Sequence, residues 1–409
     1  MQEERKRTKR RERILFICSR SNILPITNEQ NIPPRPAPAG SGRLAALDLF
    51  RGLTVVGMIF VNNPGDWAHL YWPFDHAEWN GWTPTDLIFP WFLFIVGVAG
   101  VFSLEKRMAR GADRLDLARH AFRRGMTIVV VGWLMAFYPF VPFLERLSRL
   151  RIPGVLPRIG VAYVLGTWLV LAVWRRRVAG VAVGIAILLA AHTGILLGTG
   201  FDLTPQGNVQ RAVDLAVLKG HLWKNAQGWD PEGIVSTLTA IATMLTGTLT
   251  GFFLKGAATL RQKIARLLAW GAVATAAGLL WGRALPINKN LWTASYVFFT
   301  SGAALVALAL CLFVVDFLGW KKPFAFFFTF GTNPLLVFFL SGLLAKTFGL
   351  VTWTDPAGKA VTLHAWLYRG GFSWISDPTL RSHAFALVTI AFWWAVLRVF
   401  EKRGWFWKI

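Results

Sequence analysis

The sequence predicts an all-α integral membrane protein, a bundle of about ten transmembrane helices with extracytoplasmic loops capping one face. Of its 409 residues, 54% are hydrophobic and only 16% are charged, whereas soluble domains carry about 25% charged residues. Apolar runs of about 20 residues, the length that crosses a bilayer, recur along the chain. The 21 Trp and 32 Phe are typical of a membrane protein with aromatic anchors at both interfaces.

The charge of the loops between these runs indicates the topology. Lys and Arg cluster after every second run, and cytoplasmic loops carry an excess of these residues. An even number of crossings then places both termini in the cytoplasm. One outer loop, near 144–154, opposes this pattern because it holds Arg146, Arg149 and Arg151. We expect spans at 45–63, 84–104, 124–143, 155–174, 179–199, 233–254, 264–282, 293–317, 323–348 and 382–400.

Two patterns within the runs carry information about packing. GTLTG at 247–251 has the GxxxG spacing that lets membrane helices approach closely. GTNP at 331–334 places Asn333 before a proline in an apolar region, where a regular helix is expected to break. The ninth run is therefore the least regular of the expected spans.

The first 43 residues differ from the remainder of the chain. They combine a basic run, MQEERKRTKRRER, with a linker rich in Pro, Gly and Ser, and such a segment cannot bury enough apolar surface to fold. We expect residues 1–43 to be a disordered basic cytoplasmic tail and residues 44–409 to form the membrane domain. The net charge of +23 is explained by membrane topology, so we expect no nucleic-acid partner and a lipid bilayer instead.

The loop between the first two runs is the first candidate for chemistry. Residues 60–97 contain no Lys or Arg, which indicates that this loop faces away from the cytoplasm. His76 lies in it between Asp75 and Glu78, and a neutral imidazole can take a proton near neutral pH. The alternative is an interfacial histidine that only hydrogen-bonds its loop. His69 precedes it by seven residues, but the spacing matches no standard zinc site, and we expect no metal.

Other polar residues gather near the same expected surface. Asp86, in TPTDL, either caps the second helix or faces the site. We expect substrate contacts from Trp79 and Asn80, which follow His76, and from Asn288 and Asn290, which lie at another outer boundary in PINKNLW. The chain contains no P-loop, no GxSxG and no HExxH motif, so hydrolases and nucleotide motors have no support.

Several segments together resemble one enzyme family. LDLFRGL, HAEWNGWTPTDLIFPWFLFIVG, RIPGVLPRIGVAY, DPEGIVSTLTAI and NKNLWTASYV occur in this order over roughly residues 44–335 and resemble the heparan-alpha-glucosaminide N-acetyltransferases and their bacterial relatives. The resemblance implies a transmembrane acetyltransferase that moves acetyl from cytoplasmic acetyl-CoA to the amine of a terminal glucosamine, or of a related amino sugar, on the opposite side. It also implies a bacterial inner membrane as the location.

The resemblance implies roles for individual residues. The family's catalytic histidine maps onto His76, which acts either as a general base or as a covalent carrier of the acetyl group. The family's asparagine at the end of the first helix maps onto Asn62, with Asn63 as the alternative, and would stabilise negative charge on the acetyl oxygen. Asp75 or Asp86 would orient the imidazole. Cationic partners for the phosphates of the coenzyme are available on the inner face at Arg123, Arg124, Lys321 and Lys322.

Two other functions remain open from the sequence. An amino-sugar or oligosaccharide transporter would suit about ten helices with broken segments. An O-acyltransferase for a surface polysaccharide would use the same topology with a hydroxyl acceptor. The sequence does not identify the acceptor, and its aromatic lipid-facing surface is compatible with a homodimer.

Overall fold

The computed structural model describes residues 44–198, 200, 202–224 and 228–407, so the expected tail at 1–43 lies outside the described residues. Most of the described chain is helical, and the strands in the described residues form one short antiparallel hairpin, in which Thr352 of β1 (Thr352–Thr354) pairs with Thr362 of β2 (Ala360–Thr362). The prediction of an all-α fold is therefore confirmed. The long helices are α2 (Ala45–Asn62), α3 (Ile88–Met108), α4 (Arg114–Phe137), α6 (Val155–Ala172), α7 (Arg177–Gly198), α9 (Ile234–Lys255), α10 (Leu260–Trp281), α11 (Ala294–Cys311), α13 (Pro334–Leu350) and α15 (Pro378–Lys402).

Shorter elements connect these helices. A 3-10 turn (Pro84–Leu87) extends α3 at its start, and a π-helical segment (Leu312–Phe317) extends α11 at its end. Four short helices lie in the connections, namely α5 (Phe143–Ser148), α8 (Val209–Leu218), α12 (Ala325–Thr332) and α14 (Leu363–Phe372).

Among the described residues, eight helices are long and apolar enough to cross a membrane, and α12 with α13 forms a ninth span if a 72° bend between them is counted as one crossing. The chain is thus a multi-pass membrane protein. The remaining expected span, 124–143, corresponds to α4, which is less apolar because its first half carries Arg119, Arg123 and Arg124. This helix begins earlier than expected, at Arg114, and ends at Phe137, two residues before Pro139.

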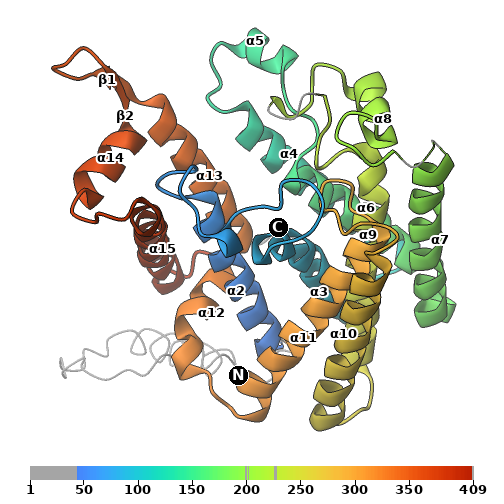
Figure 1. Cartoon of the computed structure of the whole chain (residues 1–409). Helices are drawn as coiled ribbons and strands as arrows, with labels where there is room; N and C mark the ends of the chain where they lie inside the picture. Colours follow the sequence, from blue (N-terminus) through green and yellow to red (C-terminus); the bar gives the residue numbers. More distant parts are fainter. Residues whose placement is uncertain (1–43, 199, 201, 225–227, 408–409) are drawn as a thin grey trace, which may run out of the picture. The chain divides into compact units, whose positions relative to one another are not determined.

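The core forms where neighbouring helices pack in pairs (Figure 1). The most extensive contacts join α10 with α11, α3 with α9, α4 with α6, α7 with α9 and α2 with α12. Helix α3 lies in the middle of this arrangement, because it also contacts α2, α6 and α11. The buried core around α3 and α9 includes Leu93, Met244 and Trp292. This packing fixes the start of α3, where the candidate site begins.

The contact between α3 and α9 depends on glycines. A side-chain carbon at Gly97 would overlap the backbone of Met244, and one at Gly247 would overlap the backbone of Phe94. The two helices therefore touch backbone to backbone, which only a residue without Cβ permits. This confirms the interpretation of GTLTG at 247–251 as a close-packing motif.

We expect Gly97→Ala to lower stability by about 1–3 kcal/mol, because the added methyl group must push α3 away from α9. The matched control is Gly100→Ala on the same helix, since no atom lies within 4 Å of a Cβ at that position. Midpoints of thermal unfolding in one detergent would measure both variants. Equal midpoints for the two would contradict the backbone contact.

The irregular ninth run is a bent pair of helices. Helix α12 ends at Thr332 and α13 begins at Pro334, so the bend falls at Asn333 as the GTNP pattern predicts. Asn333 is 1% exposed, and its amide donates to Trp405 O at 3.1 Å and accepts from Trp407 N at 2.9 Å. The backbone after α15 therefore bonds to the side chain at the break.

One of the three arginines in the loop that opposes the charge pattern, Arg151, belongs to an ion-pair cluster. Arg151 donates from Nε to Asp230 Oδ2 at 2.8 Å and also pairs through Nη2 with Asp230 and Glu232. The Asp230 side chain is completely buried. These two carboxylates, in the loop before α9, raise the pKa of Arg151 against the opposing effect of its burial. The charge of Arg151 is therefore balanced locally and says little about sidedness.

Candidate active site

The loop that carries His76 is held by the start of the next helix. Thr83 precedes the 3-10 turn at Pro84, and its backbone N–H donates to Asp86 Oδ2 at 3.0 Å. The same carboxylate oxygen accepts from Ala77 N at 3.1 Å. Such a capping arrangement is what the residues TPTD favour at a helix start. It leaves Asp86 1% exposed, with its second oxygen directed at His76.

His76 and Asp86 form a short hydrogen-bonded pair. The distance from His76 Nδ1 to Asp86 Oδ1 is 2.6 Å, and the His76 side chain is 47% exposed. Because an ionised carboxylate only accepts hydrogen bonds, Nδ1 carries the proton in this pair. The other ring nitrogen, Nε2, then carries the lone pair of the imidazole. This arrangement is that of a general base supported by a buried acid.

Of the two carboxylates that the sequence offered for orienting His76, Asp86 is the one that contacts the ring. Asp75 instead accepts from the backbone N–H of His76, from which its Oδ1 lies at 2.7 Å. The backbone oxygen of Asp75 accepts from Thr83 Oγ1 at 2.6 Å. Asp75 therefore shapes the loop, whereas Asp86 both caps the helix start and contacts His76.

A second loop, between α10 and α11, is bonded to the first. Gly81 N donates to Ile287 O at 2.8 Å, and Asn288 Nδ2 donates to Asn80 Oδ1 at 3.0 Å. Asn288 is fully buried, and its own Oδ1 accepts from Leu291 N at 2.8 Å. The next turn includes Trp292 with a φ of 51°, a left-handed conformation that is uncommon outside glycine. The two loops therefore form one rigid unit.

This second loop brings Lys289 to the His76 pair. Lys289 Nζ lies 3.3 Å from Asp86 Oδ1 and 3.0 and 3.3 Å from His76 Nδ1 and Nε2. The sequence places Lys289 between Asn288 and Asn290 but assigns it no role. Lys289 is 213 residues from His76 in the sequence, so no local spacing could link these two residues. The one sequence signal for Lys289 is the preceding Asn288, which marks the turn that presents the lysine.

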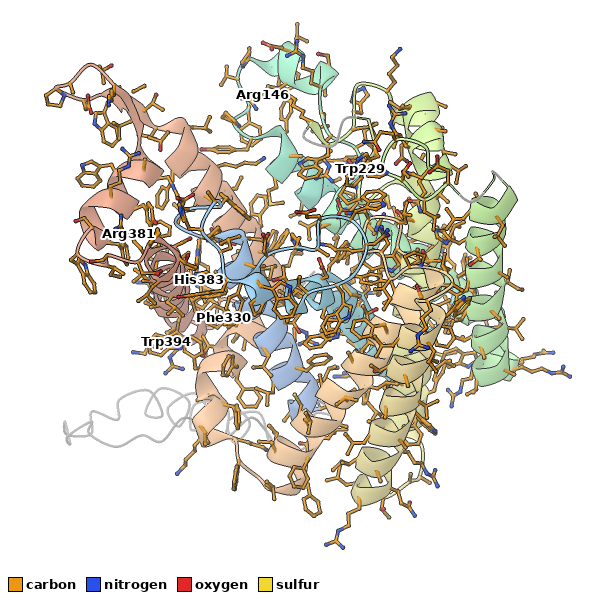
Figure 2. All side chains as sticks on the ribbon, in the orientation of Figure 1. Arg146, Trp229, Phe330, Arg381, His383 and Trp394 are labelled. Atoms are coloured by element: carbon orange, nitrogen blue, oxygen red, sulfur yellow. The ribbon has the colours of Figure 1, made fainter. Side chains whose placement is uncertain are left out.

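The four expected substrate contacts differ in what they do in the structure. Asn80 and Asn288 bond to each other, as described above, and Asn290 is half-buried beside them. Trp79 donates from Nε1 to Leu203 O at 2.7 Å, and its ring lies 5.0 Å from that of Trp229 in an edge-to-face contact. Figure 2 labels Trp229, which lies between α8 and α9. Trp79 thus joins the His76 loop to the next outer connection.

The two asparagines at the end of α2 are distinguishable. Asn63 donates from Nδ2 to Ile59 O at 2.8 Å and is thereby used in closing the last turn of the helix. Asn62 is the exposed last residue of α2. The geometry thus favours Asn62 as the residue available to a ligand.

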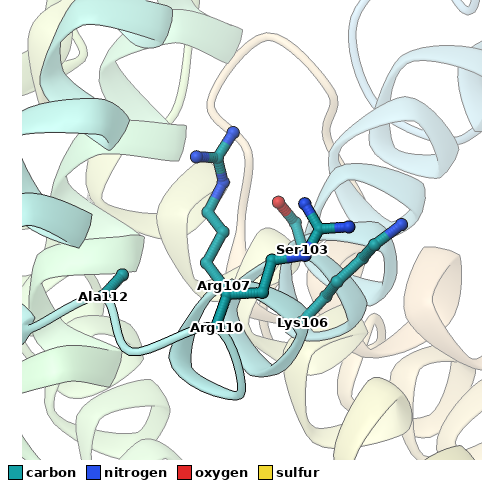
Figure 3. Close-up of a pocket in the computed structure, with 5 residues that line it drawn as sticks. All are labelled: Ser103, Lys106, Arg107, Arg110 and Ala112. Atoms are coloured by element: carbon teal, nitrogen blue, oxygen red, sulfur yellow. The ribbon is translucent and has the colours of Figure 1, made fainter. Parts of the chain in front are cut away.

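The four cations expected for the coenzyme lie on two elements, as a pair in α4 and a pair at the turn before α12. Arg123 is an exposed residue of α4, whereas the guanidinium of Arg124 lies 5.0 Å from the centre of the Tyr163 ring. Lys321 and Lys322 are exposed at the turn before α12. The sequence reasoning missed a concave alternative at the end of α3. This pocket of about 340 Å³ is lined by Ser103, Lys106, Arg107, Arg110 and Ala112 (Figure 3).

The comparisons with known proteins agree with the motifs. The family model described as "Heparan-alpha-glucosaminide N-acetyltransferase, catalytic" matches residues 43–207, which include His76 and Asp86. A heparan-alpha-glucosaminide N-acetyltransferase of Mus musculus is 26% identical over 460 residues, covering 96% of this chain and 66% of the relative. The Homo sapiens protein of the same name is 28% identical over 353 residues, covering 72% and 52%. The resemblance is confirmed, and the chain spans between half and two thirds of the length of these relatives.

Proposed function

We propose, from this relationship to the heparan-alpha-glucosaminide N-acetyltransferases, that the chain is an acetyl-CoA-dependent N-acetyltransferase of the membrane. It transfers acetyl to the amine of a terminal glucosamine or a related amino sugar. The observation that carries the proposal is the His76–Asp86 pair, whose 2.6 Å bond through Nδ1 leaves the lone pair of this partly exposed imidazole on Nε2. A base of this kind is what an amine acceptor requires, because an ammonium must lose a proton before it can attack a thioester.

In this mechanism, Nε2 of His76 takes the proton of the acceptor ammonium while Asp86 supports the developing imidazolium through Nδ1. The free amine attacks the thioester carbonyl, the new C–N bond forms and the C–S bond breaks. Asn62 donates to the carbonyl oxygen as negative charge develops on it. The attacking nitrogen loses its second proton to solvent as the amide forms, and the proton on His76 passes to the departing thiolate. In the covalent alternative, Nε2 attacks the thioester first and the amine attacks acetyl-His76.

The positions of the two polar regions support transfer across the bilayer. His76 and Asp86 lie at the start of the span Pro84–Met108, and the cationic pocket lies at its end. This span has 25 residues and is about 37 Å long, enough to cross a hydrocarbon core of about 30 Å. We infer that the pocket is cytoplasmic and binds the coenzyme phosphates, with His76 on the extracytoplasmic side. The inner membrane of a bacterium, two cytoplasmic termini and a homodimer remain predictions.

We expect the double variant Arg107→Ala, Arg110→Ala to raise the KM for acetyl-CoA by about tenfold or more, since each guanidinium bonds phosphate with charge assistance. The kcat should change little because the reacting atoms are unaffected. Initial rates at varied acetyl-CoA would measure this, with Arg176→Ala, which removes an exposed cation in the 3-10 turn just before α7, as the control. An unchanged KM would place the coenzyme elsewhere, and Arg123 and Lys321 would be tested next.

The function itself is tested with purified protein in liposomes, radiolabelled acetyl-CoA and glucosamine. An alkali-stable labelled sugar supports N-acetyl transfer. An alkali-labile product with a polysaccharide acceptor would instead indicate an O-acyltransferase. Uptake of labelled sugar without acetyl-CoA would indicate a transporter.

A further inference from the structure

The carboxylate of Asp86 needs a positive charge near it. Its side chain is 1% exposed, and an ionised group so far from water is unfavourable unless it is paired. Two groups can supply the charge, namely His76 if its ring is protonated, and Lys289. If His76 supplies it, the ring has no lone pair left for a substrate proton. The identity of the cation beside Asp86 therefore decides whether His76 can act as a base.

Lys289 is built into this position. Its Nζ lies 3.3 Å from Asp86 Oδ1, and its side chain is only 18% exposed. The flanking Asn288 bonds to Asn80 and to Leu291, so the backbone that presents Lys289 is fixed to the His76 loop. A lysine on a mobile surface loop would not be held at this distance from both partners. Lys289 is therefore held beside Asp86 by the fold of the two loops.

The remaining charged and titratable groups near the pair do not replace Lys289. Asp75 and Glu78, from the same loop, are exposed and negative. From α11, Tyr296 donates its hydroxyl to Asp86 O at 2.5 Å, and a tyrosine is neutral at pH 7. Among the described side chains that contact Asp86, the permanent positive charge is that of Lys289.

We propose that Lys289 is a positioning residue that supplies the positive charge opposite Asp86 and so keeps the His76 imidazole neutral, with its lone pair on Nε2. The catalytic consequence of this role rests on the proposed function, but the test of the role does not. The ammonium also opposes a second positive charge on the ring, from which it lies 3.0 Å away. Removing Lys289 leaves His76 as the only group able to place a positive charge beside this buried anion among the described side chains that contact it, and we expect the ring then to be protonated in the resting protein.

The test reads the protonation of His76 directly. Diethyl pyrocarbonate acylates imidazole only in its unprotonated form, and mass spectrometry of peptides assigns the modification to His76. We expect the midpoint of modification against pH to move upward by about one to three pH units in Lys289→Met relative to wild type. Lys289→Arg should keep the wild-type midpoint because it keeps the charge. Asp86→Asn should move the midpoint downward, because it removes the group that favours the protonated ring.

Arg283→Met is the matched control, since Arg283 is an exposed cation on the same connection between α10 and α11. Its midpoint should equal that of wild type. A loop distorted so that His76 separates from Asp86 would instead move the midpoint downward, as Asp86→Asn does, because the ring would lose the group that favours its protonated form. Equal midpoints for wild type and Lys289→Met would overturn the proposal, and Lys289→Gln serves for the same comparison if the methionine variant does not fold.

The catalytic consequence is measured separately. If the protein transfers acetyl groups, the acid limb of kcat/KM against pH should move upward in Lys289→Met by the same amount as the modification midpoint. Activity near that of wild type should return at alkaline pH. If wild type transfers no acetyl group, the proposed function fails while the modification experiment still decides the role of Lys289. An acid limb that stays in place while the midpoint moves would contradict the link to catalysis.

Discussion

Replacing His76 by alanine is expected to lower the rate of acetyl transfer by about 10²–10⁴-fold, the usual contribution of a general base. The acceptor amine would remain protonated, because among the described residues no other histidine pairs with Asp86 Oδ1 and could replace His76 as the base. Binding of acetyl-CoA should persist, because the cationic pocket lies at the opposite end of the span that begins at Pro84. Initial rates at saturating substrates, together with coenzyme binding by calorimetry, would measure both effects.

The same loop provides a matched control. His69 pairs with Asp66 at 2.7 Å between Nδ1 and Oδ2, and its side chain is 43% exposed, so it resembles the His76 pair in geometry. His69→Ala should transfer acetyl at the wild-type rate, and a rate for His76→Ala equal to that of wild type would refute the assignment. Incubation of wild type with labelled acetyl-CoA alone would separate the two schemes, since only the covalent one labels His76.

The second large effect is expected from Arg151→Ala, which should destabilise the fold by about 3–5 kcal/mol. The substitution leaves the carboxylates of Asp230 and Glu232 buried without their cation, and both lie just before α9. A buried charge that loses its partner costs far more than a surface pair. Denaturation midpoints in a fixed detergent would show the loss.

Replacing Arg149, on the same loop, is the control that distinguishes loss of a buried ion pair from loss of any positive charge. Arg149 pairs with Glu145 at 3.2 Å, with both side chains about 60% exposed, so Arg149→Ala should change stability by less than about 1 kcal/mol. Arg151→Met combined with Asp230→Asn and Glu232→Gln should recover much of the stability, because no buried charge remains. Similar midpoints for Arg151→Ala and Arg149→Ala would show that the Arg151 cluster contributes little.

The sequence predicts most of the helices because each needs about 20 apolar residues, a local property of the chain. The spans at 84–104 and 233–254 correspond closely to Pro84–Met108 and Ile234–Lys255. The expected start of α4 was wrong by ten residues. Its first turns contain several arginines, and a hydropathy criterion ends a span where charges begin although the helix itself continues.

The site was predictable only where its parts are close in sequence. His76 and Asp86 are ten residues apart, and the helix-start signature TPTD marks Asp86, so both could be named without a structure. Lys289 could not be paired with them, because its position depends on how α11 packs against α3. The pocket at Lys106, Arg107 and Arg110 was likewise invisible, since concavity arises from neighbouring helices that local spacing does not describe.

The bond between Asn333 and the backbone of Trp405 and Trp407 has a consequence for biosynthesis. The bend between α12 and α13 leaves Asn333 buried, and its partners are synthesised about seventy residues later. These two bonds can therefore form only after residue 407 has been synthesised, and the packing of the bent pair against the segment after α15 is completed after that point.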